Sequence, residues 1–148
     1  MSKEYKAFRL WVRCFKVVDK NGCWTLRKIR RTKTVKKGTM TYPPGFKTGK
    51  KLQYKIEGRY VVAHRVWFYA TEESREVLGR PNATVSHRCH NEHCLNPDHL
   101  VVEPLQVNQS RNTCTGVCLH RPKCIRDGNQ ADKTKFAAYF VNNKLVIE

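Results

Sequence analysis

The stretch SHRCHNEHCLNPDH, residues 86–99, contains four histidines and two cysteines within fourteen positions. Cys89, Cys94 and His99 are separated by short intervals around an Asn-Pro turn, a spacing that is typical of a metal-binding loop. Zinc prefers four sulfur or nitrogen ligands in a tetrahedron, so a fourth ligand has to come from another segment. This loop therefore predicts a zinc site and a fold organised around it.

Two upstream cysteines could supply the fourth ligand. We expect Cys23, because it follows the turn DKNG at 19–22, where a side chain is able to point at a metal. Cys14 is the alternative, but it lies among the apolar residues of a predicted helix, where a buried thiol is the simpler interpretation.

A second group lies downstream and supplies four ligands within eleven residues. Its members are Cys114, Cys118, His120 and Cys124. Each group is then a Cys₃His set, and four protein ligands are typical of structural rather than catalytic zinc. The alternative is a set of reduced cysteines scattered through a core, which composition alone rarely places so close to histidine. The sequence therefore predicts two structural zinc ions per chain.

Composition indicates the kind of partner. The 148 residues predict one domain, and 29 Lys and Arg against 12 Asp and Glu give a formal charge of +17. Such a basic chain most often binds a polyanion, above all nucleic acid. An anionic membrane surface fits less well, because the sequence has no long apolar run and no basic amphipathic helix. MSKEYKAFRLW lacks the apolar core of a signal peptide, so we expect an intracellular, reducing compartment and thiols rather than disulfides.

Hydrophobic periodicity predicts an α+β fold of small antiparallel ribbons and helices. In LQYKIEGRYVV, 52–62, successive side chains of the first strand point to opposite faces. Leu52, Tyr54 and Ile56 share one face, and Gln53 and Lys55 share the other. The expected elements are a helix over 4–16, a hairpin over 52–62 turning at Glu57-Gly58, a helix over 63–78 stopped by Gly79, a strand, loop, short strand and helix over 83–112 with the helix entered at Pro104, and a hairpin over 135–148 turning at Asn142-Asn143.

His87 is a candidate catalytic residue. It ends a predicted strand two residues before Cys89, where a zinc-anchored loop would hold its ring, and a neutral imidazole can take a proton from water. A lone histidine is more often structural, and we expect that of His64 in VVAHR. His90 and His93 are expected to face solvent or phosphate, although either could replace His99 as the zinc ligand.

The positive charge is concentrated between residues 27 and 59, which hold twelve Lys or Arg and one acid, Glu57. A two-stranded ribbon fits the DNA major groove, where glutamine can pair with adenine and lysine can reach guanine. The run RKIRRTKTVKK, 27–37, is expected to contact phosphates; a solvated face or a nuclear import signal is the alternative. The expected DNA contacts are Arg27, Lys28, Arg30, Arg31, Lys33, Gln53, Lys55 and Arg59.

These motifs together resemble a known group of enzymes. The pattern S-H-x-C-H-N-x-x-C-x-N-P-x-H-L at 86–100, then Asn108 within NQSRN, then the cluster at 114–124, closely resembles the His-Cys box homing endonucleases of the I-PpoI type. These belong to the HNH, ββα-metal or His-Me finger, nucleases. GCW at 22–24 and AHR at 63–65 also look like features of phage-type HNH nucleases. The resemblance implies a ββα-metal core stabilised by zinc.

The resemblance also implies roles for single residues. His87 would activate the attacking water, and Asn108 would hold one divalent cation, usually magnesium. Both Cys₃His sets match the two zinc sites of the family, and QYK at 53–55 resembles its DNA-reading strand. Lys51 occupies the place of an arginine that contacts the scissile phosphate, and it lacks that residue's two-pronged geometry. The other candidates for that contact or for support of the site are Lys50, Arg59, Arg65, Arg111 and Asn112.

The expected function is a sequence-specific endonuclease of the intron-homing type that cuts double-stranded DNA. The alternatives are a zinc-stabilised DNA-binding module without cleavage and a poorly specific HNH nuclease of phage or defence type. One domain over 1–148 would hold a basic DNA-binding ribbon region at 22–62, a core with zinc loops at 83–124 and a tail at 129–148. The family resemblance implies a homodimer, and a eukaryotic host would place the protein in the nucleus. The candidate dimer contacts in the tail are Phe136, Tyr139, Phe140, Leu145 and Ile147, which could equally cap the chain's own core.

Overall fold

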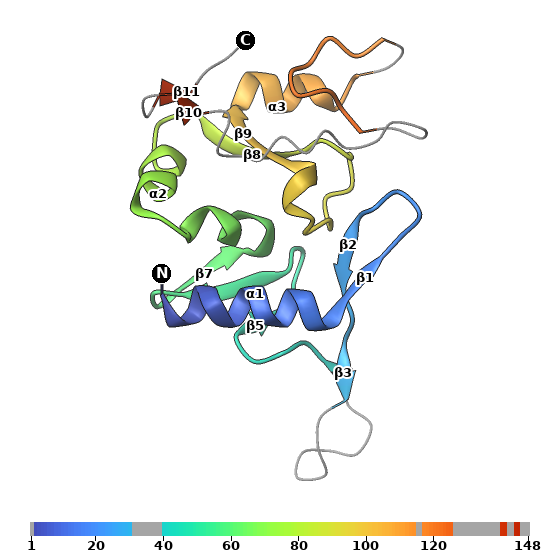
Figure 1. Cartoon of the computed structure of the whole chain (residues 1–148), viewed down its shortest axis with the longest axis vertical. Helices are drawn as coiled ribbons and strands as arrows, with labels where there is room; N and C mark the ends of the chain where they lie inside the picture. Colours follow the sequence, from blue (N-terminus) through green and yellow to red (C-terminus); the bar gives the residue numbers. More distant parts are fainter. Residues whose placement is uncertain (1, 31–39, 115–116, 126–139, 142–143, 146–148) are drawn as a thin grey trace.

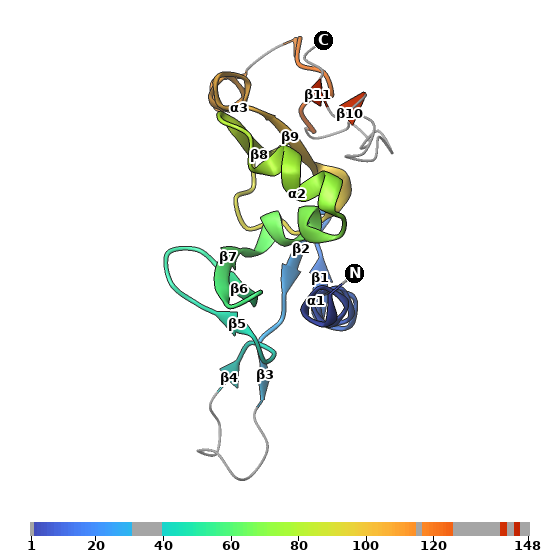
Figure 2. The same ribbon diagram turned by 90° about the vertical axis from the view of Figure 1, so that its left-hand side faces the viewer.

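The computed structural model describes residues 2–30, 40–114, 117–125, 140–141 and 144–145. The molecule is elongated, with the short ribbon β3–β4 at one end and helix α3 with the loop that follows it at the other (Figure 1, Figure 2). Helices alternate with small antiparallel sheets of two or three strands. The α+β class predicted from the sequence is confirmed.

Helix α1 (Lys3–Phe15) closely matches the predicted helix over 4–16. It begins at Ser2, whose hydroxyl accepts a hydrogen bond from the Tyr5 amide at 3.1 Å and so caps the first turn. Phe8 is fully buried, and its ring centroid lies 5.0 Å from that of Trp67. Cys14 is exposed, so its interpretation as a buried thiol is wrong: it lies on the side of the helix that faces away from this core.

Short antiparallel strands follow α1. The predicted turn at 19–22 joins β1 (Lys16–Val18) to β2 (Trp24–Leu26), and the predicted hairpin over 52–62 is β6 and β7. Glu57 and Gly58 both have positive φ, 51° and 77°, as a two-residue hairpin turn requires. The other strands of this region are β3 (Ile29–Arg30) paired with β4 (Met40–Thr41), and β5 (Phe46–Lys47) paired with β6 (Gln53–Ile56), which in turn pairs with β7 (Arg59–Val62).

The single helix predicted over 63–78 is wrong in one respect, because the structure divides it in two. A 3₁₀ helix, η1 (Ala63–Tyr69), is followed by α2 (Glu72–Leu78). The break has a local cause: Thr71 is extended, and its hydroxyl accepts a hydrogen bond from the Ser74 amide at 3.1 Å, which starts a new helix. Gly79 ends α2 as predicted.

The predicted strand, loop, strand and helix over 83–112 are present. Strand β8 (Ala83–His87) pairs antiparallel with β9 (Leu100–Pro104), with a short 3₁₀ turn, η2 (Pro97–His99), before β9. Helix α3 (Leu105–Arg111) begins directly after Pro104. One face of the ribbon, with Val85, Leu100 and Val102, joins the main core, and the other face carries the polar contacts to α3.

The tail contains the strand pair β10 (Phe140–Val141) and β11 (Lys144–Leu145), in the register of the predicted hairpin. The candidate dimer residues Phe136, Tyr139 and Ile147 lie outside the described residues. No disulfide joins any of the seven cysteines, all of which lie in the described ranges. Among the described helices, none has the length and apolar character needed to cross a membrane.

Candidate functional site

The first Cys₃His group is assembled from two distant segments. The possible ligand atoms of Cys23, Cys89, Cys94 and His99 all lie within 4.8 Å of one another. His99 Nδ1 lies 3.6 Å from Cys23 Sγ and 3.5 Å from Cys94 Sγ. Zinc bonds of about 2.1 Å to nitrogen and 2.3 Å to sulfur at the tetrahedral angle put two such atoms about 3.6 Å apart. The four residues therefore fit a tetrahedral zinc ion.

Backbone contacts bring Cys23 to the loop. Asp19 Oδ1 accepts hydrogen bonds from the amides of Asn21 and Cys23, which shapes the turn between β1 and β2. The Asn96 side-chain amide donates to the Gly22 carbonyl at 2.8 Å, and the Leu95 amide donates to the Trp24 carbonyl at 2.8 Å. Residues 22–24 are thus docked along the loop that carries the other three ligands. Of the two upstream cysteines, Cys23 and not the exposed Cys14 is in the cluster.

The protonation of this cluster depends on a cation. The hydrogen bond from Cys89 and the contact with His99 lower the pKa of Cys94 to about 4. Burial and the neighbouring Cys94 thiolate raise the pKa of Cys23 to about 11, and the hydrogen bond to Cys94 raises that of Cys89. Without a cation, one negative charge is favoured and the other two thiols keep their protons. A bound zinc ion would allow all three to ionise.

The second group closes on itself within one loop. The ligand atoms of Cys114, Cys118, His120 and Cys124 also lie within 4.8 Å of one another. His120 Nδ1 is 3.4 Å from Cys118 Sγ and 3.8 Å from Cys124 Sγ, again close to the spacing around tetrahedral zinc. Burial raises the pKa of Cys124 to about 11, against the opposing effect of Arg111. The donor set and the spacing fit structural zinc.

The two alternative histidine ligands are outside both clusters. His90 is exposed and has a φ of 60°, and His93 is exposed with Nε2 3.5 Å from Glu92 Oε1. His99 is instead buried among the thiols. The possibility that either of the exposed histidines replaces His99 is therefore wrong for this arrangement.

His87 is held by the first cluster's loop. Its Nε2 lies 3.0 Å from the carbonyl oxygen of Cys94, so the loop fixes the ring that ends β8. Burial lowers the pKa of His87, which favours the neutral imidazole. Its ring centroid lies 4.4 Å from that of His64, whose pKa is lowered to about 3 by burial and by His87 itself. Two largely buried histidines therefore pack against each other beside the zinc loop.

Asn108 lies on α3 and contacts β8, the strand that ends at His87. Its side-chain nitrogen donates a hydrogen bond to Thr84 Oγ1 at 3.1 Å. This contact orients the amide, so that Oδ1 is the atom available to a cation. Thr84 precedes His87 by three residues on β8, so Asn108 of α3 is attached to the strand that carries His87.

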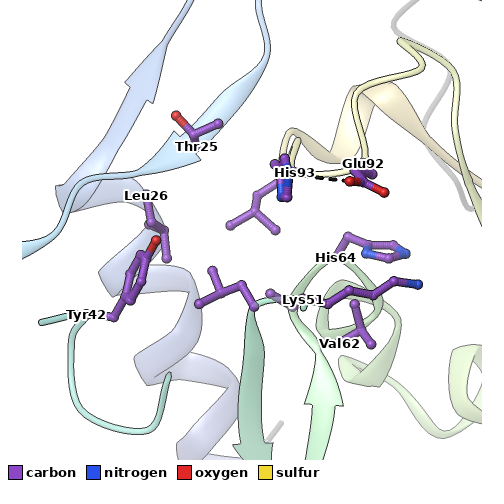
Figure 3. Close-up of a pocket in the computed structure, with 11 residues that line it drawn as sticks. Thr25, Leu26, Tyr42, Lys51, Val62, His64, Glu92 and His93 are labelled. Atoms are coloured by element: carbon purple, nitrogen blue, oxygen red, sulfur yellow. Dashed lines mark ion pairs between the residues drawn. The ribbon is translucent and has the colours of Figure 1, made fainter. Parts of the chain in front are cut away.

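A cavity of about 260 Å³ lies between β2, the residues just before β6, the end of β7, η1 and the zinc loop. Figure 3 shows Lys51, His64, Glu92 and His93 gathered at one side of it and Leu26 and Tyr42 at the other. Lys51 is exposed and lines the cavity. His87 does not line it, but packs against His64, which does.

The β5–β6–β7 sheet carries the candidate DNA-reading residues. Strand alternation places Gln53 and Lys55 on one face, opposite Val62 and Tyr60 in the register. Arg59 pairs with the buried Ile56 and lies on the opposite face, so the structure does not group it with the other two. Tyr60 was not among the residues predicted from the sequence; it is 47% exposed, and the Lys47 and Lys55 ammonium groups lie near its ring.

The expected phosphate contacts are described only in part. Arg27 and Lys28 are exposed. Arg31, Lys33 and the side chain of Arg30 lie outside what the structure describes.

Three buried charged residues near the site were not selected as a group from the sequence. Arg88, Glu103 and Arg111 are 1%, 5% and 2% exposed. Arg111 was named as a possible support of the site, but the other two were missed. The available signal was Glu103 in the otherwise apolar strand LVVEP, where a buried carboxylate requires a cationic partner.

Comparison with known families agrees with this geometry. A family model described as the zinc-binding loop region of homing endonuclease matches residues 22–136. The matched range covers most of the chain, including both Cys₃His clusters and the unit of β8, β9 and α3. Because the match covers so much of the chain and includes the clusters that fit zinc, the chain belongs to the homing-endonuclease family defined by this zinc-binding loop region.

Proposed function

We propose that the chain is a divalent-metal-dependent endonuclease that hydrolyses double-stranded DNA, with His87 as general base and Asn108 as the cation ligand. The observation that carries the proposal is the 3.0 Å contact between His87 Nε2 and the Cys94 carbonyl. A carbonyl oxygen only accepts hydrogen bonds, so the proton of the neutral ring belongs on Nε2. Nδ1 then keeps its lone pair and can take a proton from water. Membership of a homing-endonuclease family supports a nuclease that acts on DNA.

The surroundings of His87 suit a general base. Burial lowers its pKa, so the ring is ready to accept a proton at neutral pH. The Cys94 carbonyl and the His64 ring limit its rotation, which keeps Nδ1 in one direction. A fixed base of this kind contributes a factor of about 10²–10⁴ to the rate.

Asn108 fits a cation that binds together with DNA. One neutral amide oxygen is a weak magnesium site, and phosphate oxygens and waters would complete the octahedron. When bound, the cation would relieve charge at the phosphate and stabilise the departing 3′ oxygen. The hydrogen bond to Thr84 holds the amide so that Oδ1 needs no reorientation.

Lys51 is the proposed contact for the scissile phosphate. It is exposed and lines the cavity beside His64, so its ammonium group is accessible to an anion. Lysine supplies a compact charge rather than a two-pronged donor. Its role is therefore to attract and neutralise the phosphate more than to orient it.

The basic sheet would deliver and select the DNA. Gln53 and Lys55 share a face that also carries Lys47 and Tyr60, and the major groove admits a two-stranded ribbon such as β6–β7. This face supports sequence-specific recognition, as intron homing requires. We further propose a homodimer, because two-fold symmetry matches a near-palindromic site. The expected location is an intracellular, reducing compartment, and the nucleus in a eukaryotic host.

The test is cleavage of a randomised duplex DNA library in magnesium, followed by sequencing of the ends. The wild-type chain would run beside His87→Ala, with zinc content and DNA affinity measured for both. Discrete recurring ends with 3′ overhangs, lost in His87→Ala while two zinc ions and DNA binding remain, are the expected result.

Other outcomes separate the alternatives. Scattered ends that disappear in the variant would keep the catalytic assignment and remove the homing role. Equal cutting by both proteins, or no cutting by a zinc-loaded chain that binds DNA, would overturn the assignment and leave a DNA-binding module.

A further inference from the structure

A buried ion pair lies between the second Cys₃His cluster and the β8–β9 ribbon. Arg111, the last residue of α3, donates to Glu103 from Nε to Oε2 at 2.7 Å and from Nη2 to Oε1 at 2.7 Å. Both residues are almost fully buried. The Arg111 guanidinium also donates a hydrogen bond from Nη1 to Cys124 Sγ at 3.3 Å and one from Nη2 to the Pro122 carbonyl at 2.9 Å. One side chain of α3 thus contacts strand β9, the loop carbonyl of Pro122 and a candidate zinc ligand.

Glu103 continues this series of contacts to β8, the strand that carries His87. Its Oε2 accepts a hydrogen bond from Ser86 Oγ at 2.8 Å, and Ser86 directly precedes His87. A continuous chain of contacts therefore runs from Cys124 through Arg111 and Glu103 to the neighbour of His87.

The residue after His87 is tied to the same loop. Arg88 Nε donates to the Lys123 carbonyl at 2.9 Å, and the Ile125 amide donates to the Arg88 carbonyl at 2.7 Å. Both neighbours of His87 are thus connected to residues 122–125, which end the second cluster.

We propose that Glu103 and Arg111 are positioning residues that couple the second zinc site to the strand and helix carrying His87 and Asn108. The proposal rests on the proposed nuclease function for its catalytic consequence, but the coupling to zinc can be measured without it. Arg111 would compensate the negative charge of the Cys124 thiolate when zinc is bound, and Glu103 holds the guanidinium in the orientation that this contact requires.

The chemistry favours positioning over stability. A buried ion pair is a weak stabiliser, because removing both charges from water costs about as much as their attraction returns. A two-pronged pair does fix geometry, and here it fixes how α3 lies on β9, whose Glu103 also binds Ser86 of β8. Asn108 is one turn before Arg111 on α3, so the orientation of the helix sets the position of its amide.

The first arm of the test measures zinc release from the full chain to a chelator, with no DNA present. Glu103→Gln keeps the shape of the side chain but removes its negative charge. Arg111→Lys keeps the positive charge but removes the two-pronged guanidinium. The matched controls are Glu57→Gln and Arg75→Lys, which change an exposed ion pair elsewhere on the molecule in the same way. We expect one of two zinc ions to leave roughly tenfold faster in the Glu103 and Arg111 variants, and no change in the controls.

Glu103 makes this arm informative because it is not a ligand in either cluster. Faster zinc release in Glu103→Gln therefore reports transmission through Arg111. Unchanged release in both Glu103→Gln and Arg111→Lys would overturn the proposal. A chain that cuts no DNA would overturn the proposed function, whereas zinc release would still decide the coupling.

The second arm separates positioning from folding. The double variant Glu103→Leu with Arg111→Met fills the site with apolar groups, a change that buried ion pairs often tolerate with no loss of stability. We expect it to fold, to release one zinc ion faster, and to cut bound DNA at least tenfold more slowly with affinity within about twofold of wild type. Wild-type zinc release and cutting in a folded double variant would show that the pair is only structural, and would overturn the proposal.

Discussion

At the scale of single residues, Asn108 offers a direct test of the cation site. Replacing Asn108 by alanine removes the only proposed protein ligand, so we expect magnesium-dependent cleavage to fall by about 10² or more. Asn108→Asp supplies a charged oxygen at the same place and should retain cleavage at a lower magnesium concentration. The measurement is the cleavage rate against magnesium concentration, with Asn21→Ala, an exposed turn residue, as the control. Equal magnesium dependence in Asn108→Ala and wild type would contradict the assignment.

A second prediction at the scale of single residues concerns Lys51. We expect Lys51→Ala to cut DNA about 10²-fold more slowly, because an electrostatic contact to the phosphate is lost. Lys51→Arg should cut at least as fast as wild type, since a guanidinium can make two parallel hydrogen bonds to phosphate. Single-turnover rates at saturating DNA would check this. A Lys51→Ala variant with the wild-type rate would transfer the role to another cation, such as Arg65.

Sequence spacing predicted the residues of the site better than it predicted their surroundings. The two Cys₃His groups could be found because most of their ligands are close in the chain, so local spacing carries the signal. Cys23 is more than sixty residues from its partners and was chosen on the flanking turn. The buried Arg88 and Glu103 could not be found from spacing, because their partners are set by tertiary packing: Arg88 binds the Lys123 carbonyl of the second loop, and Glu103 binds Ser86 and Arg111.

At the scale of elements, the β6–β7 hairpin separates residues that the sequence grouped together. Lys55 lies on the same face as Gln53, whereas Arg59 lies on the face of the buried Ile56. We expect Lys55→Ala to weaken DNA binding and to lower the slope of log affinity against log salt by about 1. Arg59→Ala should have a smaller effect on both. Binding isotherms at several salt concentrations would measure this, and an equal loss in the two variants would contradict the assigned faces.

Helix α1 is predicted to hold the core together through Phe8. Its ring is fully buried against the rings of Phe46, Tyr54 and Trp67. Phe8→Ala should lower the free energy of unfolding by about 3–5 kcal/mol. Leu10 on the same helix is 57% exposed, and Leu10→Ala should change the free energy of unfolding by less than about 0.5 kcal/mol. Chemical denaturation of the zinc-loaded proteins would check both, and similar losses in the two would contradict the packing.

Local pattern predicted most elements, and the exceptions have local physical causes. Helix α1 and the β6–β7 hairpin follow from apolar spacing and from a glycine at the turn. The break between η1 and α2 was missed because the apolar spacing continues through it, while the capping hydroxyl of Thr71 decides where the second helix begins. Strands of two or three residues, such as β3 and β4, are too short for alternation to reveal.

At the scale of the whole molecule, the two Cys₃His clusters are placed to join segments of the chain when zinc is bound. The first cluster connects the turn after β1 to the loop after β8, and the second closes the loop after α3. His87 and Arg88 are held by backbone groups of these same loops. Zinc bound at these sites would therefore maintain both the fold and the geometry of the candidate catalytic strand.

Removal of zinc should consequently unfold more than the loops. A structural zinc ion contributes on the order of 10 kcal/mol to folding at neutral pH, which exceeds the stability of many domains of this size. We expect a strong chelator to abolish the cooperative thermal transition seen by circular dichroism, and added zinc, but not magnesium, to restore it. A metal-depleted chain with an unchanged Tm would contradict this role.

Two cysteine variants test whether stabilisation by zinc depends on the two clusters rather than on thiols in general. Cys14 is exposed and outside both clusters, so Cys14→Ser should keep two zinc ions and the wild-type Tm. Cys23→Ser removes a ligand that joins the N-terminal part of the chain to the β8 loop, so it should retain one tightly held zinc ion and melt at a lower temperature. Because the Cys94 carbonyl that holds His87 belongs to the same cluster, Cys23→Ser should also cut DNA more slowly than Cys14→Ser. Equal zinc content in the two variants would remove Cys23 from the site and return the question of the fourth ligand to the rest of the chain.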